Sequence, residues 1–104
     1  MSVHAGAVYI IAEIDILDRE RYGEYEAGFA PILVRHGGKI VGLDESAESL
    51  EGTPLGGRVV IVRFPTRQQA HDWVNDPDCQ AIAVHRRAAS TARFVSMVNE
   101  FPAS

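Results

Sequence analysis

Glu13 and Arg63 are the two charged residues whose positions most directly suggest chemistry. Each stands near the C-terminal end of a run of apolar, mostly β-branched residues, which is typical of a buried strand. Side-chain alternation places Glu13 on the same strand face as Tyr9, and we expect Arg63 to share that face. We expect the two charges to pair. The pair is either a structural salt bridge or a polar anchor at the mouth of a small-molecule cavity, with Tyr9 in its wall.

Four further candidates lie on predicted helices. Tyr25 and Trp73 have the spacing of core residues, but a phenol or an indole N–H at a cavity edge could also meet a ligand. Arg86 shares a helical face with Ile82, so its guanidinium either extends over the edge of the core or contacts an anion. His71 is the fourth candidate, as a group that could polarise a substrate.

The histidines and the single cysteine argue against a metal site. The four histidines are His4, His36, His71 and His85, and no two of them have the i, i+4 spacing that places two ligands on one helix face. A lone Cys79 excludes an internal disulfide and a cysteine-based zinc site. It lies near a predicted helix N-terminus that could lower its pKa, and a buried, inert thiol is the alternative. We therefore expect no metal and no cofactor.

Composition limits the partners. The 104 residues suit one domain spanning 1–104, with 46% hydrophobic and 23% charged residues, as in ordinary soluble globular proteins. A net charge of −4 offers no basic field for nucleic acid. No apolar run approaches the roughly 20 residues needed to span a bilayer. The first residues lack the basic region of a signal peptide, so we expect a cytoplasmic protein.

Hydrophobic periodicity predicts the order strand, helix, strand, strand, helix, strand. The predicted strands cover residues 7–16, 39–43, 58–64 and 92–99. Residues 44–57 are rich in acids, serines and turn formers, which indicates a long exposed connection.

Local signals set the helix boundaries. Asp18 is a candidate N-cap for the first helix, which should end at Gly37-Gly38. Pro31 is expected to kink or loosen that helix near its middle. Thr66 to Gln69 forms a capping box for the second helix, which Asp76-Pro77 divides into two pieces.

This order predicts an α+β, ferredoxin-like βαββαβ fold, a four-stranded antiparallel sheet with the helices on one face. Applying the right-handed crossover rule, we expect the two central strands, 7–16 and 58–64, to be parallel neighbours. The helices should cover the wholly apolar sheet face, which leaves an opposite face that is partly apolar and bare. A second copy packed sheet to sheet would cover it, so we expect a homodimer.

Short segments along nearly the whole chain resemble, in order and spacing, the family of domain of unknown function 1330 (DUF1330), within the dimeric α/β-barrel superfamily. They are Tyr9-Ile10-Ile11-Ala12 with Asp15, Tyr22 and Tyr25, Gly37-Gly38, Leu50-Glu51-Gly52, Phe64-Pro65-Thr66, Ala70 and Trp73, Asp76-Pro77-Asp78, Gln80 and Arg86. The resemblance implies a dimeric ferredoxin-like fold and no established activity.

The chain departs from that family's pattern at three positions. Arg63 stands where the pattern has an acid before Phe-Pro, and Glu13 stands where the first strand tends to carry a basic residue. The resemblance thus implies that two touching residues have exchanged charges, and a role of the family's acid does not carry over to Arg63. Cys79 replaces a frequent aromatic residue, which argues against a stacking role there.

Three functions remain open. The protein is a dimer that binds a small molecule in or beside the inter-sheet cavity, a cofactor-free enzyme similar to the monooxygenases and isomerases of that superfamily, or a structural module. A cavity of roughly 300 Å³ or more, with Glu13, Arg63 or Arg86 on its wall, would favour binding or catalysis. A filled core would favour the structural module.

Overall fold

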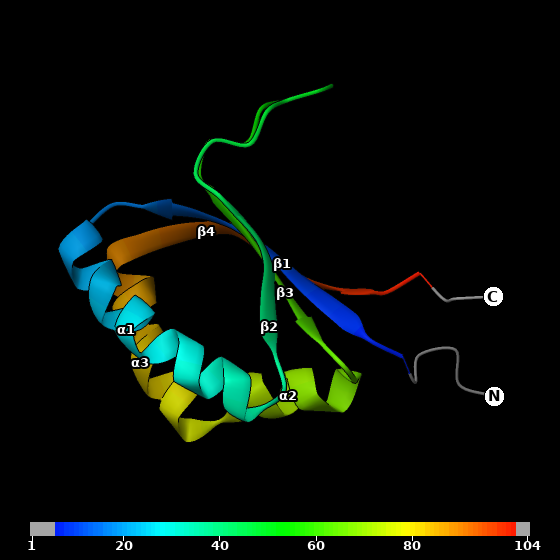
Figure 1. The fold of residues 1–104 in the computed structure, drawn as a ribbon. Helices are drawn as coiled ribbons and strands as arrows, with labels where there is room; N and C mark the ends of the chain where they lie inside the picture. Colours follow the sequence, from blue (N-terminus) through cyan, green and yellow to red (C-terminus); the bar gives the residue numbers. More distant parts are fainter. Residues whose placement is uncertain (1–5, 102–104) are drawn as a thin grey trace.

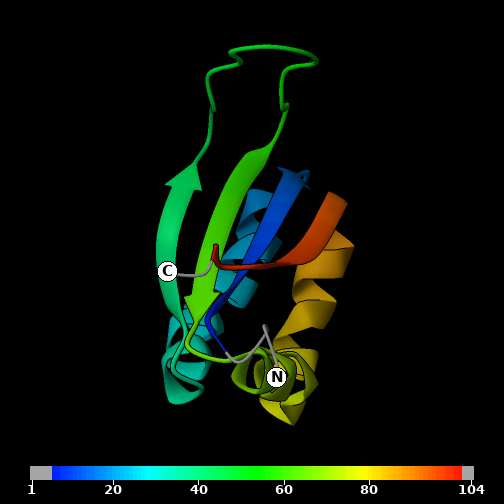
Figure 2. The same cartoon turned by 90° about the vertical axis from the view of Figure 1, so that its right-hand side faces the viewer.

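A single four-stranded sheet organises the computed structural model, which describes residues 6–101 (Figures 1 and 2). The strand order is β2-β3-β1-β4, and every neighbouring pair is antiparallel. The strands are β1 (Val8–Ile16), β2 (Lys39–Asp44), β3 (Arg58–Phe64) and β4 (Ser90–Asn99). The predicted ferredoxin-like βαββαβ fold with a four-stranded antiparallel sheet is therefore confirmed.

The predicted parallel pairing of the two central strands is wrong, because β1 and β3 run antiparallel. A crossover through a helix makes β2 run in the same direction as β1, and β3 then returns antiparallel beside β2. Lying between them, β3 must oppose both neighbours. The register consequently places Arg63 opposite Tyr9, and Glu13 opposite Val59, at the other end of the strand pair.

Three helices lie on one side of the sheet and leave its other face uncovered, as Figure 1 shows from the side and Figure 2 from the uncovered face. They are α1 (Arg19–Arg35), α2 (Arg67–Asn75) and α3 (Pro77–Ala89). We call the two sides of the sheet the helix face and the open face. None of the helices in residues 6–101 is long and apolar enough to cross a bilayer.

The helix boundaries largely follow the predicted signals. The Asp18 carboxylate accepts from the Arg21 amide at 3.1 Å, and the Thr66 hydroxyl accepts from the Gln69 amide at 3.1 Å. The return half of the capping box does not form, because Oε1 of Gln69 accepts from the Thr66 hydroxyl at 2.9 Å instead of from the Thr66 amide. The Gln69 Nε2 donates to the carbonyl of His36 at 3.3 Å. Pro31 does not end α1, which continues as one helix of 17 residues.

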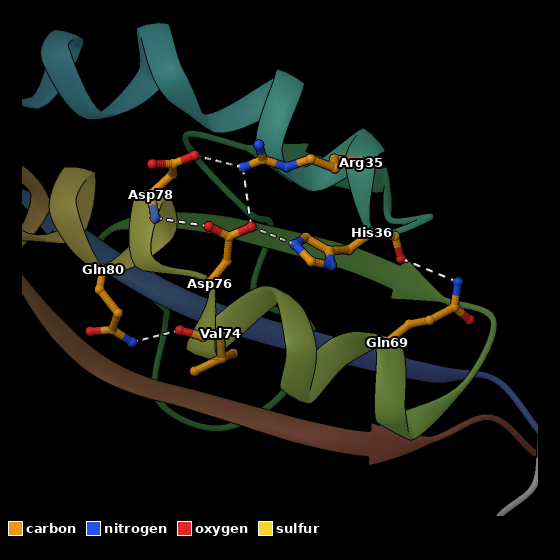
Figure 3. A network of polar contacts seen from close by, with 7 residues as sticks. All are labelled: Arg35, His36, Gln69, Val74, Asp76, Asp78 and Gln80. Atoms are coloured by element: carbon orange, nitrogen blue, oxygen red, sulfur yellow. Dashed lines mark hydrogen bonds and ion pairs between the residues drawn. The ribbon is translucent and has the colours of Figure 1, made fainter.

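A polar network fixes the end of α1 against the junction of α2 and α3 (Figure 3). Asp76 lies at its centre. One of its carboxylate oxygens lies 2.7 Å from His36 Nε2 and 3.1 Å from an Arg35 guanidinium nitrogen, while the other caps α3 by accepting from the Asp78 amide at 2.8 Å. The hydrogen bond from His36 and that from the Asp78 amide lower the pKa of Asp76. The network holds the helices in a fixed arrangement above the sheet.

Side-chain alternation along β1 produces the core. Val8, Ile10, Ala12 and Ile14 are all buried on the helix face, as predicted. They contribute to two apolar clusters, one around Phe64 and Trp73 and one around Tyr22 and Tyr25. Phe29, Val60 and Ile82 pack against both clusters and connect them.

Candidate functional site

A cavity of about 180 Å³ lies between the helix layer and the sheet. Its floor consists of helix-face side chains of the strands, including Ile10, Val60 and Val62, and α3 contributes Ala83 to the opposite wall. The lining is mainly apolar. The cavity is smaller than the roughly 300 Å³ that would favour binding. Of the three charged residues expected on its wall, Glu13, Arg63 and Arg86, it is Arg86 that lies there.

Aromatic rings form one side of this cavity. Tyr22, Tyr25, Phe29 and Trp73 follow one another with ring centroids 5.4, 5.5 and 5.9 Å apart. The first three belong to α1, where spacings of three and four residues place them on one face. Such contacts hold the rings in defined positions, so this wall presents ring edges and faces to any occupant.

Arg58, Arg86 and Arg87 lie on the cavity wall, and the first two, which are partly buried, have different surroundings. Arg58 contacts two carboxylates, with guanidinium nitrogens 2.6 Å from Glu26 and 2.8 Å from Glu45. Arg86 forms no ion pair with any residue of 6–101, and its guanidinium carbon lies 5.7 Å from the centre of the Tyr25 ring. One cation is therefore neutralised by its neighbours and the other is not.

The remaining ionisable groups on the wall favour their neutral forms. Burial raises the pKa of the Tyr22 and Tyr25 phenols, more than the nearby arginines lower it. Burial, and then the Asp76 carboxylate, raise the pKa of the Cys79 thiol. The thiol is buried, as one of the two interpretations of the sequence had it, and the helix N-terminus does not lower its pKa. Neither the phenols nor this thiol can serve as an anionic base near neutral pH.

The candidate residues suggested by the sequence lie in three different parts of the structure. Tyr25, Trp73 and Arg86 line the cavity. Tyr9, Glu13 and Arg63 lie on the open face, across the sheet from it. His71 is exposed on α2 and does not line the cavity.

The predicted ion pair between Glu13 and Arg63 does not form, because antiparallel pairing separates them along the sheet. Arg63 Nε donates to Glu100 at 3.0 Å, and the Tyr9 hydroxyl donates to the same carboxylate oxygen at 2.7 Å. The hydrogen bond from Arg63 lowers the pKa of Glu100 the most, and the hydrogen bond from Tyr9 lowers it further. The two residues do not touch, so the implied exchange of charges within a pair is also wrong. The sequence carried no signal for Glu100, which follows β4.

Glu13 is instead buried, with 1% of its surface exposed. Its Oε2 accepts from the amides of Gly56 and Gly57 at 3.0 and 3.1 Å, and thereby anchors the end of the long 45–57 connection. A side chain at Gly57 would place its Cβ 2.5 Å from the carbonyl oxygen of Ile14, which explains the glycine there. Oε1 of Glu13 has no hydrogen-bond partner within the described part of the chain.

No cluster of three or more histidine, cysteine or acidic side chains that could hold a metal ion occurs in residues 6–101. His4 lies outside the described residues, and so do residues 102–104 of the predicted C-terminal tail.

A family model described as domain of unknown function (DUF1330) matches residues 7–100. Among curated proteins, none matches the sequence. A protein of unknown function from Rhodopseudomonas palustris has a similar structure, with a TM-score of 0.80 at 20% identity, over 95% of this chain and 85% of that one.

Two further solved structures share the fold at lower similarity. SnoaB, a cofactor-independent oxygenase from Streptomyces nogalater, matches with a TM-score of 0.59 at 16% identity, over 95% of this chain and 97% of that one. HapK from Hahella chejuensis matches with a TM-score of 0.58 at 13% identity, over 93% and 95%.

Proposed function

The chain belongs to the DUF1330 family, and we propose that it binds a small, mainly apolar molecule in the cavity between the helices and the sheet. The observation that supports this most is the cavity itself, because small-molecule sites are concave and mainly apolar with a few polar groups. A void of about 150 Å³ is enough to hold benzene, so about 180 Å³ suits a single ring or a short branched chain.

Catalysis by a cofactor-free oxygenase is the second candidate, and the fold shared with SnoaB favours it. The chemistry of the wall favours binding over catalysis. Abstracting a proton from a substrate requires a base near its working pH. On the described cavity wall, the phenols and the thiol stay protonated, and Glu26 is engaged by Arg58. Incubating any bound molecule with the protein in air, and assaying for an oxidised product, distinguishes the two.

The binding proposal is tested by filling the cavity. Ala83→Leu on α3 adds carbon atoms to the cavity wall, so binding of toluene measured by calorimetry should be lost while the fold is retained. Ala88→Leu makes the same change at an exposed position of the same helix and should leave binding intact. Failure of the wild-type protein to bind toluene or any similar apolar molecule would contradict the proposal.

We also propose that a second copy covers the open face. Ile11 and Ile61 are paired across β1 and β3 at the centre of this face and are only partly buried, and Phe94 and Val98 on β4 are 37% and 45% exposed. Exposed apolar surface on a sheet favours a partner. The unpartnered Oε1 of Glu13 lies on the same side and could accept a hydrogen bond from that partner.

Light scattering of dilute protein tests this second proposal. The wild-type chain should have the mass of a dimer, and Ile61→Glu should shift it to the monomer, because the new carboxylate would be buried without a partner. Val84→Glu places the same charge at an exposed site on α3 and should leave the mass unchanged. A wild-type monomer at all concentrations would contradict the proposal.

A further inference from the structure

We infer that the cavity is selective for an anion, namely a small apolar molecule with one carboxylate, and that Arg86 is the group that binds this carboxylate. The inference rests on the proposed binding function and specifies the chemical class of the ligand. It begins from the charges on the cavity wall, which are three arginines and one glutamate in a chain of net charge −4.

The pairing and the exposure of these charges select one of the three arginines. Arg87 is exposed to solvent, whereas Arg58 and Arg86 are partly buried. Arg58 is engaged by Glu26 and Glu45, so its donors and its charge are already satisfied. Arg86 has no carboxylate partner among residues 6–101. Its guanidinium lies beside Tyr25, 5.7 Å from the ring centre and within hydrogen-bonding reach of the phenol oxygen. A guanidinium has five N–H donors, so Arg86 keeps donors available beside the phenol, and their fork geometry matches a carboxylate.

Tyr25 adds a neutral donor at the same place. Because its phenol remains protonated, its O–H can donate to an anion and carries no charge that would repel one. A cationic ligand would meet Arg86 and Arg58 with no free carboxylate on the described wall to compensate. A neutral ligand would fit the apolar lining but would leave the donors of Arg86 without a charged acceptor.

Three planar probes of nearly equal size separate these cases, which are benzoate, benzamide and the benzamidinium cation. Their affinities at neutral pH and low salt should decrease in that order. Hydrogen bonds to a charged group predict that benzoate binds about tenfold or more tightly than benzamide. Toluene serves as the apolar reference that reports the cavity alone.

Substitutions then identify the anchor. Arg86→Gln should abolish the preference for benzoate over benzamide, and its circular dichroism spectrum and melting curve should show that the variant is folded. Arg21→Gln removes the same charge from an exposed position of α1 outside the cavity wall and should preserve the preference.

The outcomes are distinguishable. Equal binding of benzoate and benzamide by the wild-type protein, or a preference for benzoate that survives in Arg86→Gln, overturns the assignment and leaves the binding function standing. Binding of toluene but of none of the three polar probes would likewise overturn the role of Arg86 and leave the binding function standing. Failure of all four probes overturns the proposed function itself.

Discussion

The two faces of the sheet are built from alternate residues of the same strands, yet they differ in almost every physical respect. On the helix face, Ile10 is covered by helices and lines a cavity, with 7% of its surface exposed. On the open face, its neighbour Ile11 is only partly buried. The helix face has little polar content apart from the arginines and Glu26 on the cavity wall, whereas the open face carries Glu13 and the cluster of Tyr9, Arg63 and Glu100. The helices therefore pack one face of the sheet and enclose the cavity there, whereas none of the described helices covers the other face.

The largest expected effect comes from comparing alanine substitutions at two adjacent isoleucines, Ile10 on the helix face and Ile11 on the open face. Ile10→Ala should lower the free energy of unfolding by about 3 kcal/mol, because it removes a buried side chain from a packed core. Ile11→Ala should have a clearly smaller effect in dilute protein. Denaturant unfolding of both variants measures the contrast, and equal losses would show that the open face is as well packed as the helix face.

A smaller effect is expected where the open face meets the long connection. Gly57→Ala brings a Cβ within 2.5 Å of the Ile14 carbonyl oxygen and disturbs the amide that Glu13 accepts from, so it should cost about 2 kcal/mol. Gly56→Ala is the matched control, since an added Cβ there meets nothing within 4 Å. Thermal unfolding compares them. Similar melting temperatures for the two variants would argue against this anchor.

The smallest effect concerns acid stability on the open face. Arg63 and Tyr9 lower the pKa of Glu100 below its usual 4.5, so this carboxylate stabilises the fold above that pH and the contribution is lost as the pH falls through the lowered value. Glu100→Gln should therefore lose less stability than the wild type between pH 6 and pH 3. Glu51→Gln, at an exposed position, should behave as the wild type. Identical acid unfolding of Glu100→Gln and wild type would contradict the role of this cluster.

Much of the fold followed from short-range patterns in the sequence. Alternation in β1 predicted which residues face the helices, and Asp18, Thr66 and Asp76-Pro77 predicted where helices begin, because capping depends on residues a few positions apart. These signals are local. They therefore do not depend on how the strands are paired.

The candidate site was predicted only in part, because its decisive features depend on distant pairings. Tyr25, Trp73 and Arg86 line the cavity as their helical spacing allowed. The partners of Glu13 and Arg63 could not be found from spacing alone. Glu13 binds amides that lie more than 40 residues further along the chain, and the assumed strand direction placed Arg63 at the wrong end of the sheet. The cavity itself is a property of how far the helices stand from the sheet, which no local pattern encodes.

Methyl NMR during a titration with toluene tests the functional account most directly, since Ile10 and Ile11 report on opposite sides of one strand. Binding in the cavity should shift the methyl signals of Ile10 and Val60 and leave those of Ile11 and Ile61 in place. Shifts confined to Ile11 and Ile61, or no shift at any of the four, would contradict a binding site between the helices and the sheet.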